Sequence, residues 1–245
     1  MPVGEPFVIL SSVNSTNKHA MQAVHDHLAT HGSAFFTLEQ TAGRGQRGRH
    51  WHSAAGENLL LSVVLLPDRP FPEFPFTFNT SIALACYNFF KIYAGDETRL
   101  KWPNDLYWRD RKAGGLLVEN SIRGSHWNAS ILGMGININQ TSFDNSLPNP
   151  VSLRQITGKM YDPIVLAKEL CAHIEHCWQQ WLFDPDGILE AYNRVLYKKD
   201  EEQRFISETE GVFSATVKEV NRAGELVLQT PEQKQFPFGS LRWLK

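Results

Sequence analysis

The strongest constraint on the fold is an almost unbroken apolar run, LLLSVVLL, at residues 59–66. It is far shorter than the roughly 20 residues that a membrane-spanning helix needs, and its aliphatic composition is typical of a strand. Successive side chains of a strand point to opposite faces of the sheet. A strand that is apolar on both faces must be covered on both, so the run predicts a sheet with cover on either side.

The remaining hydrophobic pattern predicts strands and helices around this run. In the first helix, Met21, Val24 and Leu28 follow helical spacing, with a cap at 15–16 and an end near Gly32. Strands are expected at residues 7–12, 34–39, 58–66, 114–122 and 127–138, with two short strands in 99–108 that are bent at Pro103-Asn104-Asp105. Helices are expected at 16–31, 77–93, 163–181 and 186–196, and a loop at 140–150.

The hydrophobic pattern of the sequence changes near Glu202. From about residue 203 onwards, apolar residues alternate with polar ones, and turns are expected at Glu210-Gly211 and Ala223-Gly224. This pattern predicts a small all-β module at the C-terminal end. We therefore expect two domains, residues 1–202 and residues 203–245.

Charge and cysteine content narrow the class of protein. The 245 residues carry a formal net charge of −2, so no overall positive field draws the chain to nucleic acid or to an anionic membrane. Cys86, Cys171 and Cys177 cannot all pair, which favours a reducing compartment. The N-terminal segment has no basic flank before its apolar run and does not look like a secretory signal. We expect a soluble, cytoplasmic protein.

A loop rich in glycine and arginine stands out against this charge balance. Residues 41–52, here called the Gly/Arg loop, contain three glycines, Arg44, Arg47, Arg49 and Trp51. Glycines let the backbone approach a ligand closely, and arginines offer forked donors for phosphate or carboxylate. The loop lacks the Lys-Ser/Thr ending of a P-loop and is followed by no helix start. It predicts either an anion site or an exposed loop without a ligand.

A second polar cluster surrounds the predicted turn at Pro103. Asn104 and Asp105 occupy that turn, and Lys112 precedes Gly114-Gly115, where a ligand can approach the backbone. A carboxylate at such a turn suits a metal-bound phosphate. The alternative is a plain Pro-Asn-Asp turn flanked by solvated lysines.

Two further groups of polar side chains lie at the ends of predicted strands. Asn137 and Asn139 alternate with isoleucines, so both amides point to one face, where they can donate to a nucleotide or form a polar surface. Ser15, Thr16 and Asn17 lie at a strand-to-helix turn, where they can hold a small polar group or cap the helix. The pattern leaves both alternatives open for each group.

Together, these four clusters resemble the biotin protein ligases, which attach biotin to carboxylases. The family's Gly-Arg-Gly-Arg-x-Gly-Arg-x-Trp loop is matched at 43–51, its Lys-Trp-Pro-Asn-Asp at 101–105, its Lys-x-x-Gly-x-Leu-x-Glu at 112–119 and its Gly-x-Gly-x-Asn at 133–137. Order and spacing agree over about residues 8–139. The sequence departs from the family at Gln46, where a second arginine often stands, so only a backbone role is expected there.

The resemblance implies a reaction and a fold. Biotin's carboxylate attacks the α-phosphate of ATP to give biotinyl-5'-AMP, and a lysine of a biotin carboxyl carrier protein then attacks the mixed anhydride. The implied ligands are biotin, ATP and Mg²⁺, without a metal site of the protein's own. The implied fold is α+β, a mixed catalytic sheet flanked by helices as in class II synthetases, with a small SH3-like barrel at 203–245.

The resemblance also implies roles for single residues. Lys112 and Arg44 are expected to be catalytic. The residues implied for biotin binding are Ser15, Thr16, Asn17, Gln40, Arg44, Gly45, Gln46 and Lys112. The residues implied for nucleotide binding are Arg47, Arg49, Trp51, Asn104, Asp105 and Asn137.

The same resemblance implies which partners to expect. Some family members repress transcription through an N-terminal winged helix, but the first core strand here is expected near Phe7. We therefore expect a monofunctional ligase that binds no specific DNA and no membrane, as a monomer or weak homodimer. The carrier protein of acetyl-CoA carboxylase or of a related carboxylase is the expected protein substrate.

Two other functions and a metal site are weaker interpretations. A lipoate or octanoate ligase or transferase resembles the same catalytic fold, but lacks this loop pattern and the C-terminal module. An RNA-binding protein can use an Arg/Gly loop, but the chain is net acidic and Lys112 would have no role. His173 and Cys177 share a helix face, yet Cys177 belongs to an apolar stripe, which favours a structural role over metal binding.

Overall fold

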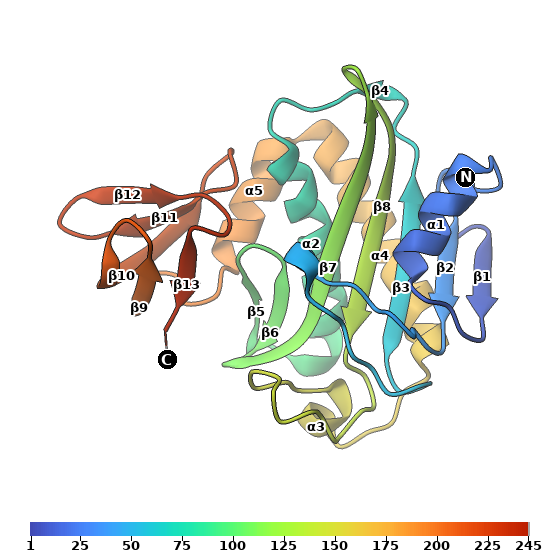
Figure 1. Ribbon diagram of the computed structural model, residues 1–245, viewed down its shortest axis with the longest axis horizontal. Coiled ribbons are helices and arrows are strands. Elements are labelled where there is room, and N and C mark those ends of the chain that lie inside the picture. The colour runs from blue at the N-terminus through green and yellow to red at the C-terminus, as the bar shows by residue number, and fades with distance from the viewer. Residues whose placement is uncertain (245) are drawn as a thin grey trace.

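The computed structural model describes residues 1–244 as two β-sheets with helices packed around the larger one (Figure 1). The strands of the larger sheet are β1 (Phe7–Leu10), β2 (Ala34–Thr37), β3 (Leu59–Leu65), β4 (Arg69–Pro70), β5 (Thr98–Lys101), β6 (Asp105–Trp108), β7 (Arg111–Arg123) and β8 (His126–Ile136). The helices are α1 (Thr16–His25), α2 (Pro75–Ala94), α3 (Leu153–Thr157), α4 (Pro163–Phe183) and α5 (Pro185–Arg194), with a 3-10 turn, η1, at Gln46–Gly48. The C-terminal strands are β9 (Glu202–Ser207), β10 (Gly211–Val220), β11 (Leu226–Gln229), β12 (Gln233–Phe236) and β13 (Leu241–Trp243).

The larger sheet is mixed, as predicted. Its strands run in the order β1-β2-β3-β8-β7-β6-β5, with β4 paired to β8. β1 and β2 are parallel and are connected through α1, because a parallel pair needs a crossover. The other neighbouring strands are antiparallel. The long hairpin of β7 and β8 therefore lies in the middle of the sheet and carries the candidate site on one face.

The apolar run that predicted a doubly covered strand is β3, and all of its residues are buried. Leu59, Leu61 and Val63 belong to the main core, which lies on the α2 and α4 side. Val64 points the other way and packs with Phe35 in a second core beneath α1. The prediction of cover on both faces is confirmed, because β3 contributes to a core on each side of the sheet.

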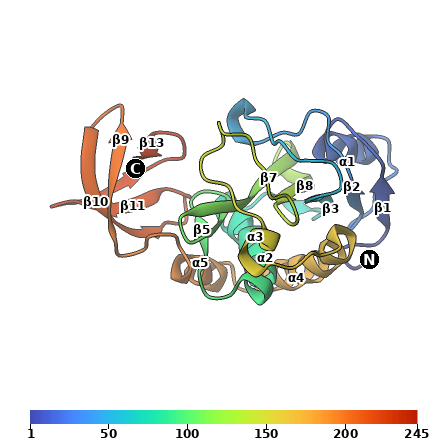
Figure 2. The same cartoon turned by 90° about the horizontal axis from the view of Figure 1, so that it is seen from below.

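Helices cover the two faces unequally. Figure 2 shows α2, α4 and α5 on one side of the sheet, with α1 and the Gly/Arg loop on the other. On the α2 and α4 side, Phe78, Trp127, Trp178 and Trp181 form an aromatic cluster with ring centroids 4.8–6.0 Å apart. The predicted apolar stripe on α4 is therefore core. Within residues 1–244, no helix is both long and apolar enough to cross a membrane.

The structure corrects two local predictions. α1 ends well before Gly32, because His27 adopts a left-handed backbone with φ 56°, and Leu28 is 77% exposed. The helix α3 was not predicted, since five residues are too few to show a hydrophobic period. It is held by a capping box, in which the Ser152 hydroxyl accepts from the Gln155 backbone and the Gln155 side chain accepts from the Ser152 backbone.

The C-terminal module is an antiparallel sheet in the order β12-β11-β10-β9-β13. It adjoins the larger sheet beside β5, β6 and α5 (Figure 1). The side chain of Asn193 in α5 forms two hydrogen bonds with the backbone of Val220. The Trp102 indole, in the turn between β5 and β6, donates to the Gly224 carbonyl at 2.9 Å. The predicted all-β module is confirmed, and these contacts fasten it to one end of the larger sheet.

Candidate active site

A patch of bare backbone on β7 and β8 forms the floor of the candidate site. Gly115 on β7 pairs with Gly135 on β8. A Cβ at Gly135 would lie 2.5 Å from the Trp51 ring, and a Cβ at Gly133 would overlap the Asn17 carboxamide. Only glycine lets these two side chains lie against the sheet, which explains the glycines of the GMGININ segment. We call this patch the glycine floor.

Lys112 lies beside the glycine floor. Its ammonium forms an ion pair with Asp105 at 2.6 Å and lies 5.8 Å from the centre of the Trp51 ring. The Lys112 backbone is held in turn, because its N–H donates to the Asn149 carbonyl and its carbonyl accepts from Val151. The side chains of Lys112 and Asp105 are 29% and 25% exposed, so the pair is partly shielded from water yet accessible to a ligand.

A buried network of hydroxyl and amide groups lies at the start of α1. The Thr16 backbone N–H donates to the Gln40 side-chain oxygen at 2.9 Å. The Ser62 hydroxyl lies 2.7 Å from Thr16 Oγ1 and 2.6 Å from Asn17 Oδ1. Ser15 is also buried, and as the N-cap residue it makes no side-chain capping bond. Capping by Ser15 therefore does not account for this group. We call the network the polar pocket, and its binding of a small polar ligand stays a prediction.

Sequence reasoning missed two residues of this network as site residues. Ser62 is fully buried inside β3, and Glu119 on β7 accepts from the Asn17 amide at 2.7 Å. Glu119 also pairs with Arg44 at 3.1 Å, so it joins the pocket at α1 to the Gly/Arg loop. The sequence offered one indication of each residue. Ser62 is a lone serine within an apolar run, and Glu119 is the last position of the Lys-x-x-Gly-x-Leu-x-Glu motif.

The Gly/Arg loop is a hydrogen-bonded turn with the short helix η1 at its tip. Its two limbs are joined by bonds from the Gly45 N–H to the Arg49 carbonyl at 2.7 Å and from the Trp51 N–H to the Gly43 carbonyl at 3.0 Å. A Cβ at Gly43 would lie 2.4 Å from the Trp51 carbonyl oxygen, so glycine permits the limbs to meet. This geometry carries the Trp51 ring onto the glycine floor.

The three arginines of the loop do not converge on one point. Arg44 turns back to the sheet through its ion pair on β7. Arg47, predicted on the nucleotide side, instead donates to the Gly239 carbonyl at 3.2 Å and lies 5.4 Å from the centre of the Phe238 ring. Arg49 is exposed. The structure therefore separates Arg47 from the other predicted nucleotide residues, because backbone and aromatic groups of the C-terminal module hold its guanidinium.

The asparagines of the site bond to the backbone. Asn137, only 4% exposed, donates to the Val151 carbonyl at 3.1 Å. Asn139 exchanges two hydrogen bonds with the backbone of Tyr161, and Asn104 donates to a carbonyl of β7. A polar outer face is thus the wrong interpretation of Asn137 and Asn139, which are buried. The nucleotide contacts of Asn104 and Asn137 stay predictions.

A cavity of about 290 Å³ opens between the Gly/Arg loop and the loop at residues 140–147. Its lining includes Gln40, Gly43, His50, Trp51, Gln140 and Leu147. The cavity thus borders both the polar pocket, through Gln40, and the glycine floor, through Trp51. Its size is close to that of small-molecule sites in proteins.

The cysteines have structural environments. Cys86, Cys171 and Cys177 are free thiols in the core, and burial raises the pKa of Cys177 to about 11 and that of Cys171 to about 12. These thiols stay protonated near neutral pH. Within residues 1–244, no three His, Cys, Asp or Glu side chains are grouped to hold a metal ion. Cys177 is buried with the other apolar residues of α4.

The mixed sheet thus gathers the glycine floor, the Lys112–Asp105 pair and the Gly/Arg loop on one face. The model of the biotin/lipoate A/B protein ligase family matches residues 9–137, which is more than half of the chain. The chain belongs to this family.

Known relatives agree over most of the chain. It is 28% identical over 236 residues to the bifunctional ligase/repressor BirA of Bacillus spizizenii, covering 94% of this chain and 71% of the relative. It is 30% identical over 241 residues to the biotin--[acetyl-CoA-carboxylase] ligase of Paracoccus denitrificans, covering 93% and 95%. The structure of biotin protein ligase from Aquifex aeolicus in complex with biotin and ATP matches with a TM-score of 0.79 at 22% identity, covering 97% and 98%. The predicted fold class is confirmed by this match.

Proposed function

We propose that this chain is an ATP-dependent biotin ligase. It activates biotin as biotinyl-5'-AMP and transfers the biotinyl group to a lysine of a biotin carboxyl carrier protein of acetyl-CoA carboxylase or a related carboxylase. The observation that carries the proposal is the Lys112–Asp105 pair beside the glycine floor, on the same face as the buried hydroxyl–amide pocket. The named activity of the Paracoccus denitrificans relative and the ligands of the Aquifex aeolicus structure support the choice of substrates.

The first step joins two anions, so it needs positive charge. A biotin carboxylate oxygen forms a bond to the α-phosphorus, and the bond from that phosphorus to pyrophosphate breaks. One cation about 4 Å away, at an effective dielectric near 20, contributes roughly 4 kcal/mol before desolvation. Since about 1.4 kcal/mol is a factor of ten in rate, one or two such groups decide the rate. We assign this role to Lys112 and, from the loop, to Arg44.

The polar head group of biotin is assigned to the pocket at the start of α1. Its ureido ring offers one carbonyl acceptor and two N–H donors, and the pocket offers hydroxyl and amide groups that can match them. Burial strengthens such bonds and penalises any group left unpaired. The proposed biotin ligands are the side chains of Ser15, Thr16, Asn17 and Gln40, the backbone of Arg44, Gly45 and Gln46, and Lys112.

The nucleotide is assigned to the Trp51 end of the site. The cavity beside Trp51 is open to a ligand, and aromatic rings stack on bases. The remaining proposed nucleotide residues are Arg49, Asn104, Asp105 and Asn137. Mg²⁺ usually binds through one or two carboxylates together with substrate phosphates, and the partly exposed Asp105 fits that donor set. When bound with ATP, the ion would neutralise phosphate charge.

Transfer to the carrier is a direct displacement. The carrier lysine amine attacks the carbonyl carbon of the anhydride, an amide forms, the C–O bond breaks and AMP leaves. No nucleophile of the ligase is required. We assign both steps to residues 1–202 and treat residues 203–245 as a separate SH3-like domain, in a monomer or weak homodimer.

Pyrophosphate release tests the proposal. The protein is assayed with biotin and ATP together, with each alone, and with lipoate or octanoate plus ATP. Release is expected only with biotin and ATP, followed by attachment of biotin to a carrier domain. Release with lipoate or octanoate but not with biotin would assign the chain to the other branch of the family. Salt-dependent RNA retention without any pyrophosphate release would favour an RNA-binding function.

A further inference from the structure

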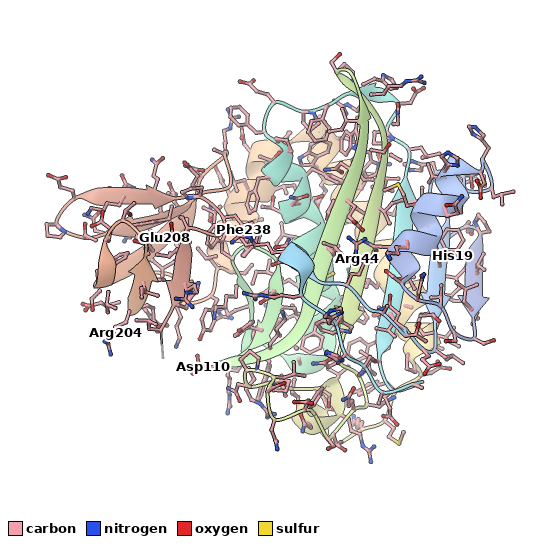
Figure 3. The ribbon with its side chains drawn as sticks, in the orientation of Figure 1. His19, Arg44, Asp110, Arg204, Glu208 and Phe238 are labelled. Carbon is pink, nitrogen blue, oxygen red and sulfur yellow. The ribbon has the colours of Figure 1, made fainter. Side chains whose placement is uncertain are left out.

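The tip of the Gly/Arg loop is fastened to the C-terminal module. The Arg47 guanidinium donates to the Gly239 carbonyl at 3.2 Å and lies over the Phe238 ring, 5.4 Å from its centre. Donor and acceptor are 192 positions apart in the sequence. Figure 3 shows Phe238 between the C-terminal sheet and the loop. The contact therefore joins the C-terminal module to the loop that carries Trp51 onto the glycine floor.

The backbone on both sides of this contact is unusual. Gly239 has φ 91°, and a Cβ there would overlap the Arg47 guanidinium. Arg47 itself has φ 55°, a left-handed conformation that non-glycine residues adopt at a cost. The positive φ of Gly239 favours glycine, and the missing Cβ leaves room for the guanidinium. Arg47 adopts a less favourable backbone in the turn that presents it.

Phe238 is in turn held by the catalytic sheet. Its ring meets the Trp102 ring edge to face, with centroids 5.9 Å apart at 84°. Trp102 lies in the turn that leads to Asp105 and donates to the Gly224 carbonyl. A continuous series of contacts therefore runs from the turn before Asp105, through Phe238, to Arg47 in the Gly/Arg loop.

We propose that Phe238 and Gly239 are positioning residues for the ligase reaction. By holding Arg47, they keep the Gly/Arg loop over the site before substrates bind. A loop that is already positioned loses less conformational freedom on binding, so the affinity for biotin is higher. Arg47 then acts as an anchor to the C-terminal module and not as a ligand of the nucleotide. The expected change in the affinity for biotin rests on the proposed function. The anchoring of Arg47 does not.

Two measurements on the full chain test this proposal. The first is the rate of trypsin cleavage after Arg47 without ligands, normalised to cleavage after Arg123, the exposed last residue of β7 before the β7–β8 turn. The second is the separate determination of KM for biotin and kcat for pyrophosphate release. The variants are Phe238→Ala, Gly239→Ala and the conservative Phe238→Tyr. Val212→Ala is the control, because Val212 is an exposed apolar residue of the same module, 55% exposed against 46% for Phe238.

Anchoring of Arg47 by Phe238 and Gly239 predicts specific changes in cleavage rate and in KM. Phe238→Ala and Gly239→Ala should each speed cleavage after Arg47 and raise KM for biotin by about threefold to tenfold, as expected for losing a cation–π contact and a hydrogen bond, with kcat nearly unchanged. Phe238→Tyr and Val212→Ala should behave like the parent.

Equal cleavage after Arg47 in all variants, or a fall in kcat at unchanged KM, would overturn the proposal. If the parent protein released no pyrophosphate, the proposed function would fail, and the cleavage rates alone would still decide whether the anchor exists.

Discussion

Lys112 and Asp105 form an ion pair that differs from those on the surface. Its partners are less than one-third exposed and lie beside backbone that is bare of side chains. The Lys91–Asp96 pair, with side chains 43% and 92% exposed, belongs to the ordinary surface class, which contributes little to stability. A partly shielded ammonium interacts more strongly with an arriving anion, so the site pair is expected to matter for chemistry.

Replacing Lys112 tests this expectation. Lys112→Ala should slow formation of biotinyl-5'-AMP by about 10²- to 10³-fold, because the variant lacks the charge that stabilises the transition state. Pyrophosphate release measures the rate, and a thermal melt checks that the fold is kept. Lys91→Ala is the matched control, since it also removes a lysine from an aspartate partner. A parental rate in Lys112→Ala would reject the catalytic role.

Replacing Ser62 tests the assignment of biotin to the pocket at α1. Ser62→Ala leaves Thr16 and Asn17 without the hydroxyl between them, and an unpaired buried polar group costs about 1–3 kcal/mol. KM for biotin should therefore rise roughly tenfold. Ser81→Ala makes the same change at a fully buried serine of α2, so it controls for loss of a core hydroxyl and should leave KM unchanged. Equal KM values for the two variants would contradict the assignment of the pocket.

Among the elements, the Gly/Arg loop carries the most proposed site residues. Its arginines are exposed, its limbs are held by a few backbone bonds, and its glycines make ordering costly. Elements of this kind open locally at low free energy. A ligand that spans the glycine floor and the loop would supply the ordering free energy and shield the anhydride from water.

Limited digestion reports the closure of this loop. Trypsin should cut after Arg44, Arg47 and Arg49 in the free protein, and biotin with ATP should slow these cuts by about tenfold or more, as for a locally opening segment that the ligand holds closed. Cleavage after Arg123, the exposed last residue of β7 before the β7–β8 turn, is the internal control and should not respond to ligand. Equal cutting of the loop with and without ligand would mean that it is not a lid.

The whole molecule carries a formal net charge of −2, and its arginine-rich segment is confined to one loop. A protein with a slightly negative net charge has no overall positive field to draw it to DNA. We therefore expect no sequence-selective gel shift at physiological salt, with biotin and ATP present. The bifunctional ligase/repressor of Bacillus subtilis serves as the positive control. A selective shift that survives competitor DNA would contradict this prediction.

Much of the fold and part of the site were predictable from short stretches of sequence. The double burial of β3, the start of α4 at an Asp-Pro cap and the alternating C-terminal strands follow from period, caps and turns, which act over a few residues. Lys112, Asp105 and Trp51 could be named because their motifs are contiguous. The end of α1 was missed because the apolar spacing continued to Leu28 after the backbone had turned.

The sequence by itself determined which residues could meet a ligand, since glycine, arginine and lysine have intrinsic conformational and charge properties. Only the tertiary structure decided which of these residues lie together. Ser62 joins the pocket at α1 because β3 passes beneath that helix, and Arg47 contacts the C-terminal module because that module offers it a carbonyl and a ring. Such contacts depend on how distant elements pack, and local pattern carries no information about that packing.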